Sequence, residues 1–140
     1  MQTVYPLSRT KFLEGYLQWR ASGGHSFRAA CMDSTYTYSS AHEFRDDLAG
    51  VLGTVALTGL VAGPDGWADA ADATITGLTP GDTVRSFAIY RDTGSAATDE
   101  LIWVATSHAD TTPINRVVDG SGSMTFSFAN SPGRIFQLGS

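Results

Sequence analysis

Two apolar runs separated by a small polar loop occupy the middle of the chain, between residues 82 and 107. The first run, 84–91, and the second, 101–106, place apolar side chains on both faces of an extended backbone. Strands that are apolar on both faces belong in the middle of a packed sheet. The segment between them, 92–100, begins with turn-forming residues and continues with small ones. The pattern predicts an antiparallel hairpin with a protruding loop.

Strict alternation along this hairpin also predicts which side chains share a face. On the first strand, Phe87 and Ile89 fall on one side. On the second strand, Leu101, Trp103 and Ala105 fall together. A large aromatic residue in a strand of this kind belongs to the core, and we expect that place for Trp103.

Short runs with strand-type alternation, separated by Gly and Pro, continue from residue 54 towards the C-terminus. The cleanest is Met124, Phe126 and Phe128, whose apolar side chains recur every second residue. We expect that strand and the segment 134–138 to form a second hairpin. Regular short strands with turn signals between them indicate an antiparallel sandwich or a barrel-like sheet.

The N-terminal third predicts helical elements around one strand. Ser8 fits the cap of a helix over 9–19, and the segment 25–33 alternates as a strand. A capping-box pattern at Ser40–Glu43 opens a short second helix over 41–48.

These elements predict a mainly β fold, α+β by strict count, with one or two short N-terminal helices. The length fits a single domain over 1–140. We divide it into an N-terminal arm at 1–7, a helix–strand–helix region at 8–50 and a β-rich core at 54–138.

The chain has few charged residues, and this limits the kinds of partner that it is expected to bind. Charged residues make up 16% of the sequence, against about 25% in an average globular protein. The formal net charge is −5 and Lys11 is the single lysine, so a basic surface for nucleic-acid binding is not expected. No stretch approaches the ~20 apolar residues of a membrane span and no secretory signal is evident, so we expect synthesis in the cytoplasm.

Residues that carry chemistry are few and scattered. His25, His42 and His108 have no second ligand at a metal-type spacing, although His108 could pair with Asp110. The single cysteine, Cys31, has the sequence context of a small buried hydrophobe.

Three acidic residues near Trp67 leave one alternative open, a calcium site. They are Asp65, Asp69 and Asp72. Their spacing matches no EF-hand loop, and turn chemistry accounts for the same residues. No nucleophile motif or phosphate loop is present, and we therefore expect no catalytic residue, no metal and no cofactor.

Five segments carry a resemblance by their order along the chain: 8–15, 42–44, 57–59, 88–98 and 134–138. The hairpin with its Ala96-Ala97-Thr98 loop is the most specific of them. In this order the chain resembles small structural proteins encoded among the capsid and tail genes of tailed bacteriophages.

The resemblance implies a non-enzymatic virion protein on the capsid surface. Its implied role is that of a decoration or cement protein, which binds the major capsid protein and copies of itself and stabilises the shell. The alternative is a tail or fibre module that binds a host surface glycan, through exposed aromatic residues, or another tail protein.

Contacts with partners are expected from three places in the sequence: the apolar arm 1–7, the polar and aromatic segment around residues 36–38, and the hairpin loop. The candidate contact residues are Val4, Tyr5, Leu7, Tyr36, Tyr38, Thr93, Ser95 and Thr98. A chain with so few charges has little to protect a strand edge from pairing with another chain, so we expect an oligomer or a partner-bound form.

Overall fold

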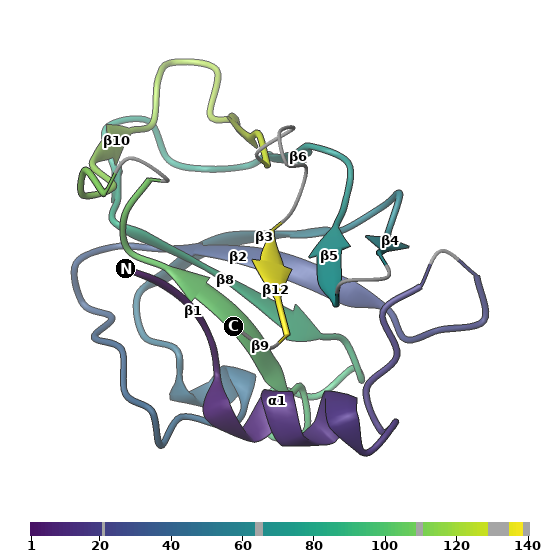
Figure 1. Cartoon of the computed structure of the whole chain (residues 1–140). Coiled ribbons are helices and arrows are strands. Elements are labelled where there is room, and N and C mark those ends of the chain that lie inside the picture. Colours follow the sequence, from purple (N-terminus) through teal and green to yellow (C-terminus); the bar gives the residue numbers. More distant parts are fainter. Residues whose placement is uncertain (21, 64–65, 109–110, 129–134, 139–140) are drawn as a thin grey trace.

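The predicted hairpin forms the middle of a five-stranded antiparallel sheet (Figure 1). The computed structural model describes residues 1–20, 22–63, 66–108, 111–128 and 135–138. The order of the strands across the sheet is β1-β9-β8-β2-β3. In chain order these strands are β1 (Gln2–Val4), β2 (Phe27–Met32), β3 (Val51–Ala56), β8 (Ser86–Arg91) and β9 (Leu101–Ala105).

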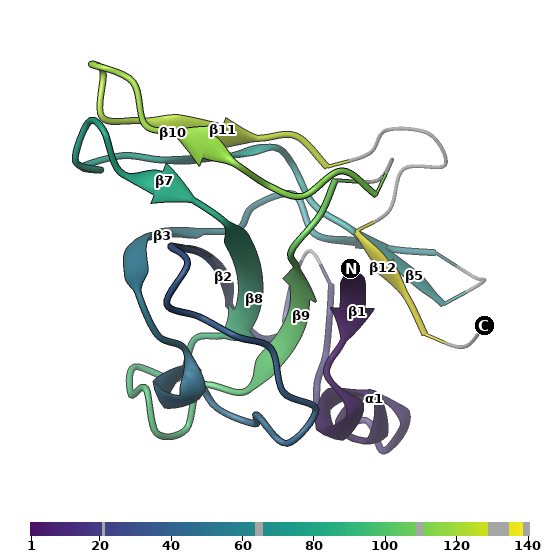
Figure 2. The same ribbon diagram turned by 90° about the vertical axis from the view of Figure 1, so that its left-hand side faces the viewer.

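Three smaller antiparallel sheets form a second layer over one face of the large sheet (Figure 2). The first pairs β7 (Thr83–Val84) with β10 (Arg116–Val117), and the second pairs β6 (Ala73–Ile75) with β11 (Met124–Phe126). The third has the order β12-β5-β4, built from β4 (Val61–Ala62), β5 (Trp67–Asp69) and β12 (Phe136–Gln137). The C-terminal strand therefore does not form a hairpin with β11, as the sequence predicted, because it pairs with β5.

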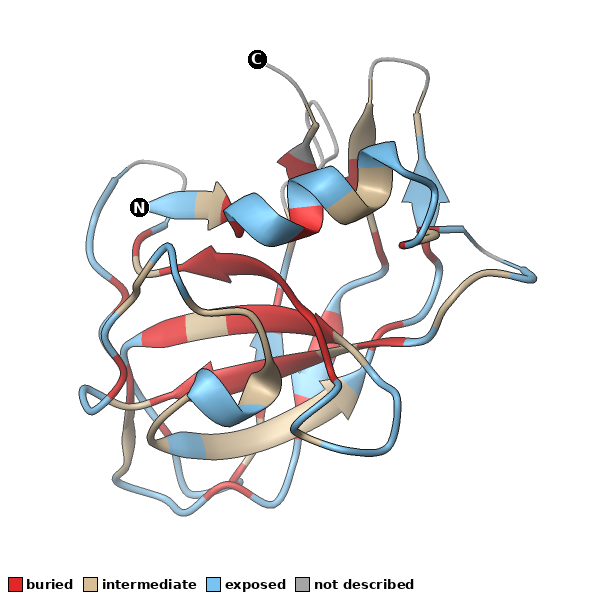
Figure 3. Cartoon of the chain, turned by 90° about the horizontal axis from the view of Figure 1, so that it is seen from below, coloured by how far each residue is buried: buried red, intermediate tan, exposed pale blue. Residues whose placement is uncertain are grey.

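Each face of the large sheet has its own hydrophobic core. The larger core lies between the large sheet and the small sheets, and draws residues from Val4 to Phe136. The smaller core lies on the opposite face and contains Ala30, Met32, Ala88 and other side chains of the central strands. Seen from below, the inner strands are buried along most of their length, whereas β3 at the edge is largely intermediate (Figure 3). This confirms that the central strands are covered on both faces.

A β-bulge in the hairpin changes the predicted faces of β9. Ile89 pairs with Trp103 and Tyr90 pairs with Leu101, so Ile102 has no partner of its own. The extra residue reverses the alternation, as a bulge does. Leu101 therefore points into the smaller core, and Ile102 and Trp103 both belong to the larger one. The grouping of Leu101 with Trp103 was wrong, but the buried position of Trp103 is confirmed.

A single α-helix is present in the described residues, which confirms a mainly β fold with a short N-terminal helix. This helix, α1 (Pro6–Leu13), begins earlier and ends sooner than the predicted helix over 9–19. It ends near Gly15, whose φ of 75° lies in the left-handed region that favours glycine. Beyond it, Trp19 lies in a segment without regular secondary structure, where its Nε1 donates to the carbonyl oxygens of Val61 and Asp69 at 3.1 and 3.0 Å.

The predicted second helix over 41–48 is reduced to one 3₁₀ turn, η1 (Arg45–Asp47). The Asp47 carboxylate accepts hydrogen bonds from the backbone N–H groups of Glu43 and Phe44 at 2.8 and 3.1 Å. Phe44 has an extended backbone and forms a bridge with Glu100. This attachment to the end of the hairpin prevents a regular helix from forming there.

The prediction of an outward-reaching arm at 1–7 is also wrong. Gln2–Val4 form β1, which pairs with β9 through Gln2↔Ala105 and Val4↔Trp103, and Pro6 and Leu7 begin α1. Val4 and Tyr5 retain 3% and 0% of their surface exposed, so they belong to the core of this chain. The physical reason is the apolar edge of β9, which the N-terminal residues cover.

Candidate functional site

The hairpin loop presents the three predicted polar contact residues to solvent. Thr93, Ser95 and Thr98 are all exposed. The Oγ1 atoms of Thr93 and Thr98 lie 2.5 Å apart, and Thr98 Oγ1 also donates to the Ser95 carbonyl oxygen at 3.3 Å. The loop is therefore an ordered surface with hydroxyl groups, in agreement with its predicted position.

A buried carboxylate, which the sequence analysis did not single out, organises this loop. Asp99 has no exposed surface and accepts bonds from the backbone N–H and the hydroxyl of Thr93 at 2.6 and 2.7 Å. The Nε atom of Arg45 donates to the other carboxylate oxygen at 2.7 Å. Burial alone would raise the pKa of Asp99, but the bonds from Thr93 and Arg45 outweigh it and hold the pKa below its usual value. The sequence signal for this role of Asp99 was its position as a charged residue next to an apolar strand.

Most of the predicted apolar and aromatic contact residues are turned into the protein. Val4, Tyr5 and Tyr36 are buried and Tyr38 is half-buried, whereas Leu7 is 41% exposed. The expectation that Tyr36 contacts a partner is therefore wrong. Its ring belongs to the smaller core, which needs large side chains to cover the second face of the sheet.

Tyr5, Tyr36 and His42 form a hydrogen-bonded row. The two tyrosine hydroxyl oxygens lie 2.6 Å apart, and the Tyr36 hydroxyl oxygen lies 3.2 Å from Nδ1 of His42. Burial, followed by the bond with Tyr36, raises the pKa of Tyr5 far above its usual value. A tyrosine held this strongly in its neutral form serves packing, not proton transfer near neutral pH.

The other two histidines lie apart from one another. His25 accepts a hydrogen bond at Nδ1 from the Gln18 N–H at 3.3 Å, and its pKa is lowered by burial first and by Arg91. His108 is exposed, and its predicted partner Asp110 lies outside the described residues.

The described residues do not form the calcium site that the sequence left open as an alternative. They contain no group of three or more His, Cys, Asp or Glu side chains placed to hold a metal ion. Asp65 is outside the described residues. The Oδ1 atom of Asp72 accepts a hydrogen bond from the Phe128 N–H at 3.2 Å, which links the segments next to β6 and β11.

The outer edge of β3 is a candidate contact surface. β3 is the last strand of the large sheet, and no described strand pairs with its outer edge (Figure 2). Its six residues, VLGTVA, include no charged residue and no proline. The bulge where it pairs with Cys31 and Met32 interrupts only its beginning. The sequence predicted poorly protected edges, but the pairing order was needed to identify this one.

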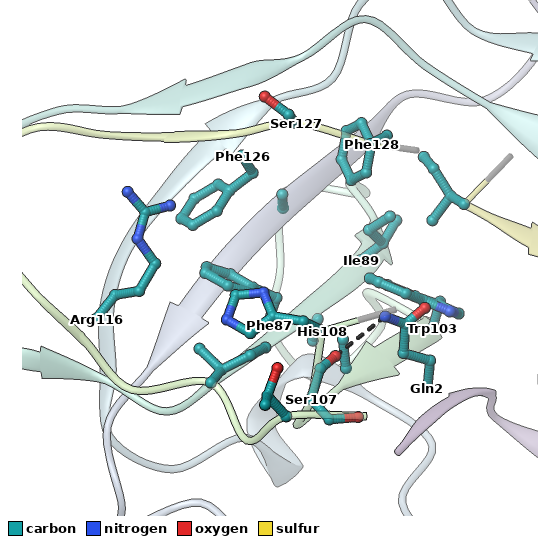
Figure 4. A pocket seen from close by; sticks show the side chains of 16 residues that line it. Gln2, Phe87, Ile89, Trp103, Ser107, His108, Arg116, Phe126, Ser127 and Phe128 are labelled. Carbon is teal, nitrogen blue, oxygen red and sulfur yellow. Dashed lines mark hydrogen bonds between the residues drawn. The ribbon is translucent and has the colours of Figure 1, made fainter. Parts of the chain in front are cut away.

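An apolar cavity of about 630 Å³ opens between β8 and β9 on one side and β11 with the segment 112–116 on the other (Figure 4). Phe87, Ile89, Trp103 and Phe126 contribute to its walls. The cavity lies where the second layer passes over the centre of the large sheet. No sequence signal predicted it, because its walls come from segments that are distant along the chain.

No helix in the described part of the chain is long and apolar enough to cross a membrane. Comparison of the chain with models of protein families, with curated proteins and with solved structures found no match.

Proposed function

We propose that this chain is a non-enzymatic structural protein of a tailed-bacteriophage virion, which decorates the capsid and bridges major capsid subunits. The observation that carries the proposal beyond the resemblance is the uncharged outer edge of β3, which no strand of the described residues pairs with. A long edge strand without charges or proline pairs readily with a strand of another chain. We expect a capsid subunit, or a second copy of this chain, to supply that strand.

This mode of binding needs no cofactor and no pre-formed pocket. Backbone hydrogen bonds supply the affinity, and side chains on alternate positions supply the specificity. Val51 at one end of β3 is 43% exposed, and it offers an apolar contact beside the backbone groups. Weak contacts of this kind add up when one protein touches several subunits at once.

The hairpin loop is a second contact surface in the proposal. Its exposed hydroxyls, Thr93, Ser95 and Thr98, are held in place by Asp99, which lowers the entropy lost on binding.

The decisive experiment is to locate the protein in purified virus particles. Mass spectrometry should detect it in the particle, and labelling with a specific antibody should place it on the head in electron micrographs. Absence from intact particles would overturn the proposal. Label on the tail alone would overturn the capsid assignment.

The edge itself is tested by adding charges to it. The pair Val51→Lys and Ala56→Lys places two lysines at exposed ends of β3, and the pair Val61→Lys and Val117→Lys does the same on the small sheets. We expect the first pair to abolish sedimentation with capsids and self-association by light scattering. If the two double variants sediment with capsids and self-associate to the same extent, β3 is not the strand that contacts the partner.

The glycan-binding alternative is tested on a glycan array. The burial of Tyr36 removes one of the aromatic side chains on which that alternative was based. We expect no saturable sugar binding, and its detection would favour the tail or fibre module instead.

A further inference from the structure

The cavity between the two layers differs from the rest of the protein in its charge. The molecule carries 14 acidic and 9 basic residues, yet the described residues that line the cavity include no Asp or Glu. Among the described lining residues, Arg116 is the side chain with a formal charge and His108 is the other titratable one. In an acidic protein this lining favours a ligand with a negative charge.

Arg116 keeps charge available for such a ligand. Its Nη1 atom donates to the backbone carbonyl oxygen of Thr125 at 3.3 Å. Within the described residues, the three ion pairs are Lys11–Glu43, Arg45–Asp99 and Arg91–Glu100, so Arg116 makes no direct ion pair there. Its charge contributes to lowering the pKa of Asp119, after the hydrogen bonds that Asp119 accepts from Ser121. Arg116 is exposed, and its charge is not buried against the protein.

The remainder of the cavity is apolar and aromatic. Figure 4 shows the Arg116 side chain near Phe126 at one end, whereas Ile89, Trp103 and Phe128 lie towards the other end. A volume of about 630 Å³ lies within the range of small-molecule sites, and apolar walls with few polar groups are typical of them. The arrangement matches a ligand with an apolar body and one anionic end.

We propose that this cavity binds an amphipathic monocarboxylate of the fatty-acid type, with its apolar tail against Ile89 and Trp103 and its carboxylate beside Arg116 and His108. Burial of the tail supplies most of the binding energy, since apolar area removed from water is the main favourable contribution. The guanidinium group of Arg116 selects the carboxylate by a charge-assisted hydrogen bond. This site is independent of the β3 edge, so the proposal does not depend on a virion role.

Two ligands with the same tail and opposite charge provide the test. Isothermal titration calorimetry with decanoate and with decylammonium, each up to about 1 mM, separates charge selection from simple burial of the tail. We expect saturable binding of decanoate that is at least about fivefold tighter than binding of decylammonium. No saturable binding of decanoate, or equal affinity for the two ligands, would overturn the proposal.

Variants then place the ligand in this cavity. Arg116→Gln should weaken decanoate binding about fivefold and leave decylammonium binding unchanged or stronger. Arg9→Gln, an exposed arginine on α1 outside the cavity, is the matched control and should change neither. Ser127→Trp, at an exposed position of the lining, should block both ligands. Equal effects of the two arginine variants, or full binding by a folded Ser127→Trp protein, would contradict the assigned site.

The wild-type protein supplies a measurement that does not depend on any variant folding correctly. In nuclear magnetic resonance spectra, decanoate should shift the signals of the Trp103 indole and the Ile89 methyl groups. Signals of Tyr36, in the opposite core, should not shift. Shifts confined to other regions would show that decanoate binds elsewhere.

Discussion

The carboxylate of Asp99 and the guanidinium group of Arg45 join two segments 54 residues apart, through a bond of 2.7 Å between Oδ2 and Nε. Asp99 is fully buried, whereas the Arg45 side chain is 32% exposed and packs over the ring of Tyr90. This pair attaches the 3₁₀ turn η1 to the end of the central hairpin. The contact surface offered by the loop therefore depends on one buried charge.

Replacing the Asp99 carboxylate should lower the free energy of unfolding and make that free energy less dependent on pH in the acid range. Because the folded pKa of Asp99 lies below its unfolded value of about 3.9, the carboxylate stabilises the fold above that pH. The stabilisation is lost as the pH falls through the folded pKa. Asp99→Asn should cost about 2 kcal/mol near neutral pH, the value of a hydrogen bond to a charged group.

Urea denaturation at several pH values measures this effect. The difference between wild type and Asp99→Asn should shrink below about pH 4. Asp46→Asn, in the same turn but with an exposed side chain, is the control and should change stability by less than about 0.5 kcal/mol. A constant difference between wild type and Asp99→Asn at all pH values would contradict the assigned role.

Trp103→Ala should cost about 3–5 kcal/mol, since it removes a large aromatic side chain that is only 7% exposed. Such a loss is a large share of the stability of a typical domain. Val117→Ala, at a side chain 62% exposed, should be nearly neutral. If the urea midpoint of Trp103→Ala stays near that of wild type, the central position of β9 is wrong.

The tyrosine row should make the fold sensitive to alkali. Burial, followed by the bond with Tyr36, raises the pKa of Tyr5. Its unfolded pKa is about 10, so stability should fall as the pH rises above that value, because only the unfolded chain releases the proton. Tyr36→Phe should cost about 1–3 kcal/mol by leaving the buried Tyr5 hydroxyl without this partner. Ultraviolet titration should detect ionisation of Tyr5 only as the protein unfolds, and ionisation in the folded state would contradict this expectation.

Removal of residues 1–7 should unfold the protein and not merely weaken partner binding. The deletion takes away β1 and the buried side chains of Val4 and Tyr5. Leu7→Ser changes the exposed part of the same segment and should leave the melting temperature within a few degrees. A folded deletion variant, by circular dichroism and thermal melting, would show that β1 is dispensable.

The Cys31 thiol should be unreactive in the folded protein. Burial, the largest influence, raises its pKa to about 11, so little thiolate exists near neutral pH. Ellman's reagent at pH 8 should detect the thiol only after denaturation, whereas an added exposed cysteine, Thr98→Cys, should react at once. Rapid reaction of the wild-type protein would mean that β2 opens readily.

The sequence predicted the elements whose apolar residues recur with a strong local period. It did not predict the features that depend on contacts between residues far apart in the chain. The hairpin of β8 and β9 was predictable because both runs are apolar on two faces. The end of α1 depends on Gly15 together with the distant carbonyl groups that hold Trp19. Nothing in the apolar pattern of β9 distinguishes a bulge at Ile102 from regular alternation.

The candidate sites divide in the same way. Exposure of Thr93, Ser95 and Thr98 followed from a polar loop between strands, which is a local property. Burial of Tyr36 depends on the second face of the sheet, which has to be covered by whichever segment lies across it. The outer edge of β3, which no described strand pairs with, and the cavity at Trp103 can be located only when the order of the strands is known.

The pairing of β1 with β9 has a consequence for how the protein is made. The first strand leaves the ribosome about 100 residues before the strand it pairs with, since Gln2 lies opposite Ala105. During that interval Val4 and Tyr5 have no sheet to join and remain available to other apolar surfaces. Contacts between such distant positions slow folding, because the long loop must close before they are formed. Synthesis of this protein is therefore expected to include a late step in which β1 inserts at the edge of the sheet, and crowded or rapid expression should favour aggregation before that step.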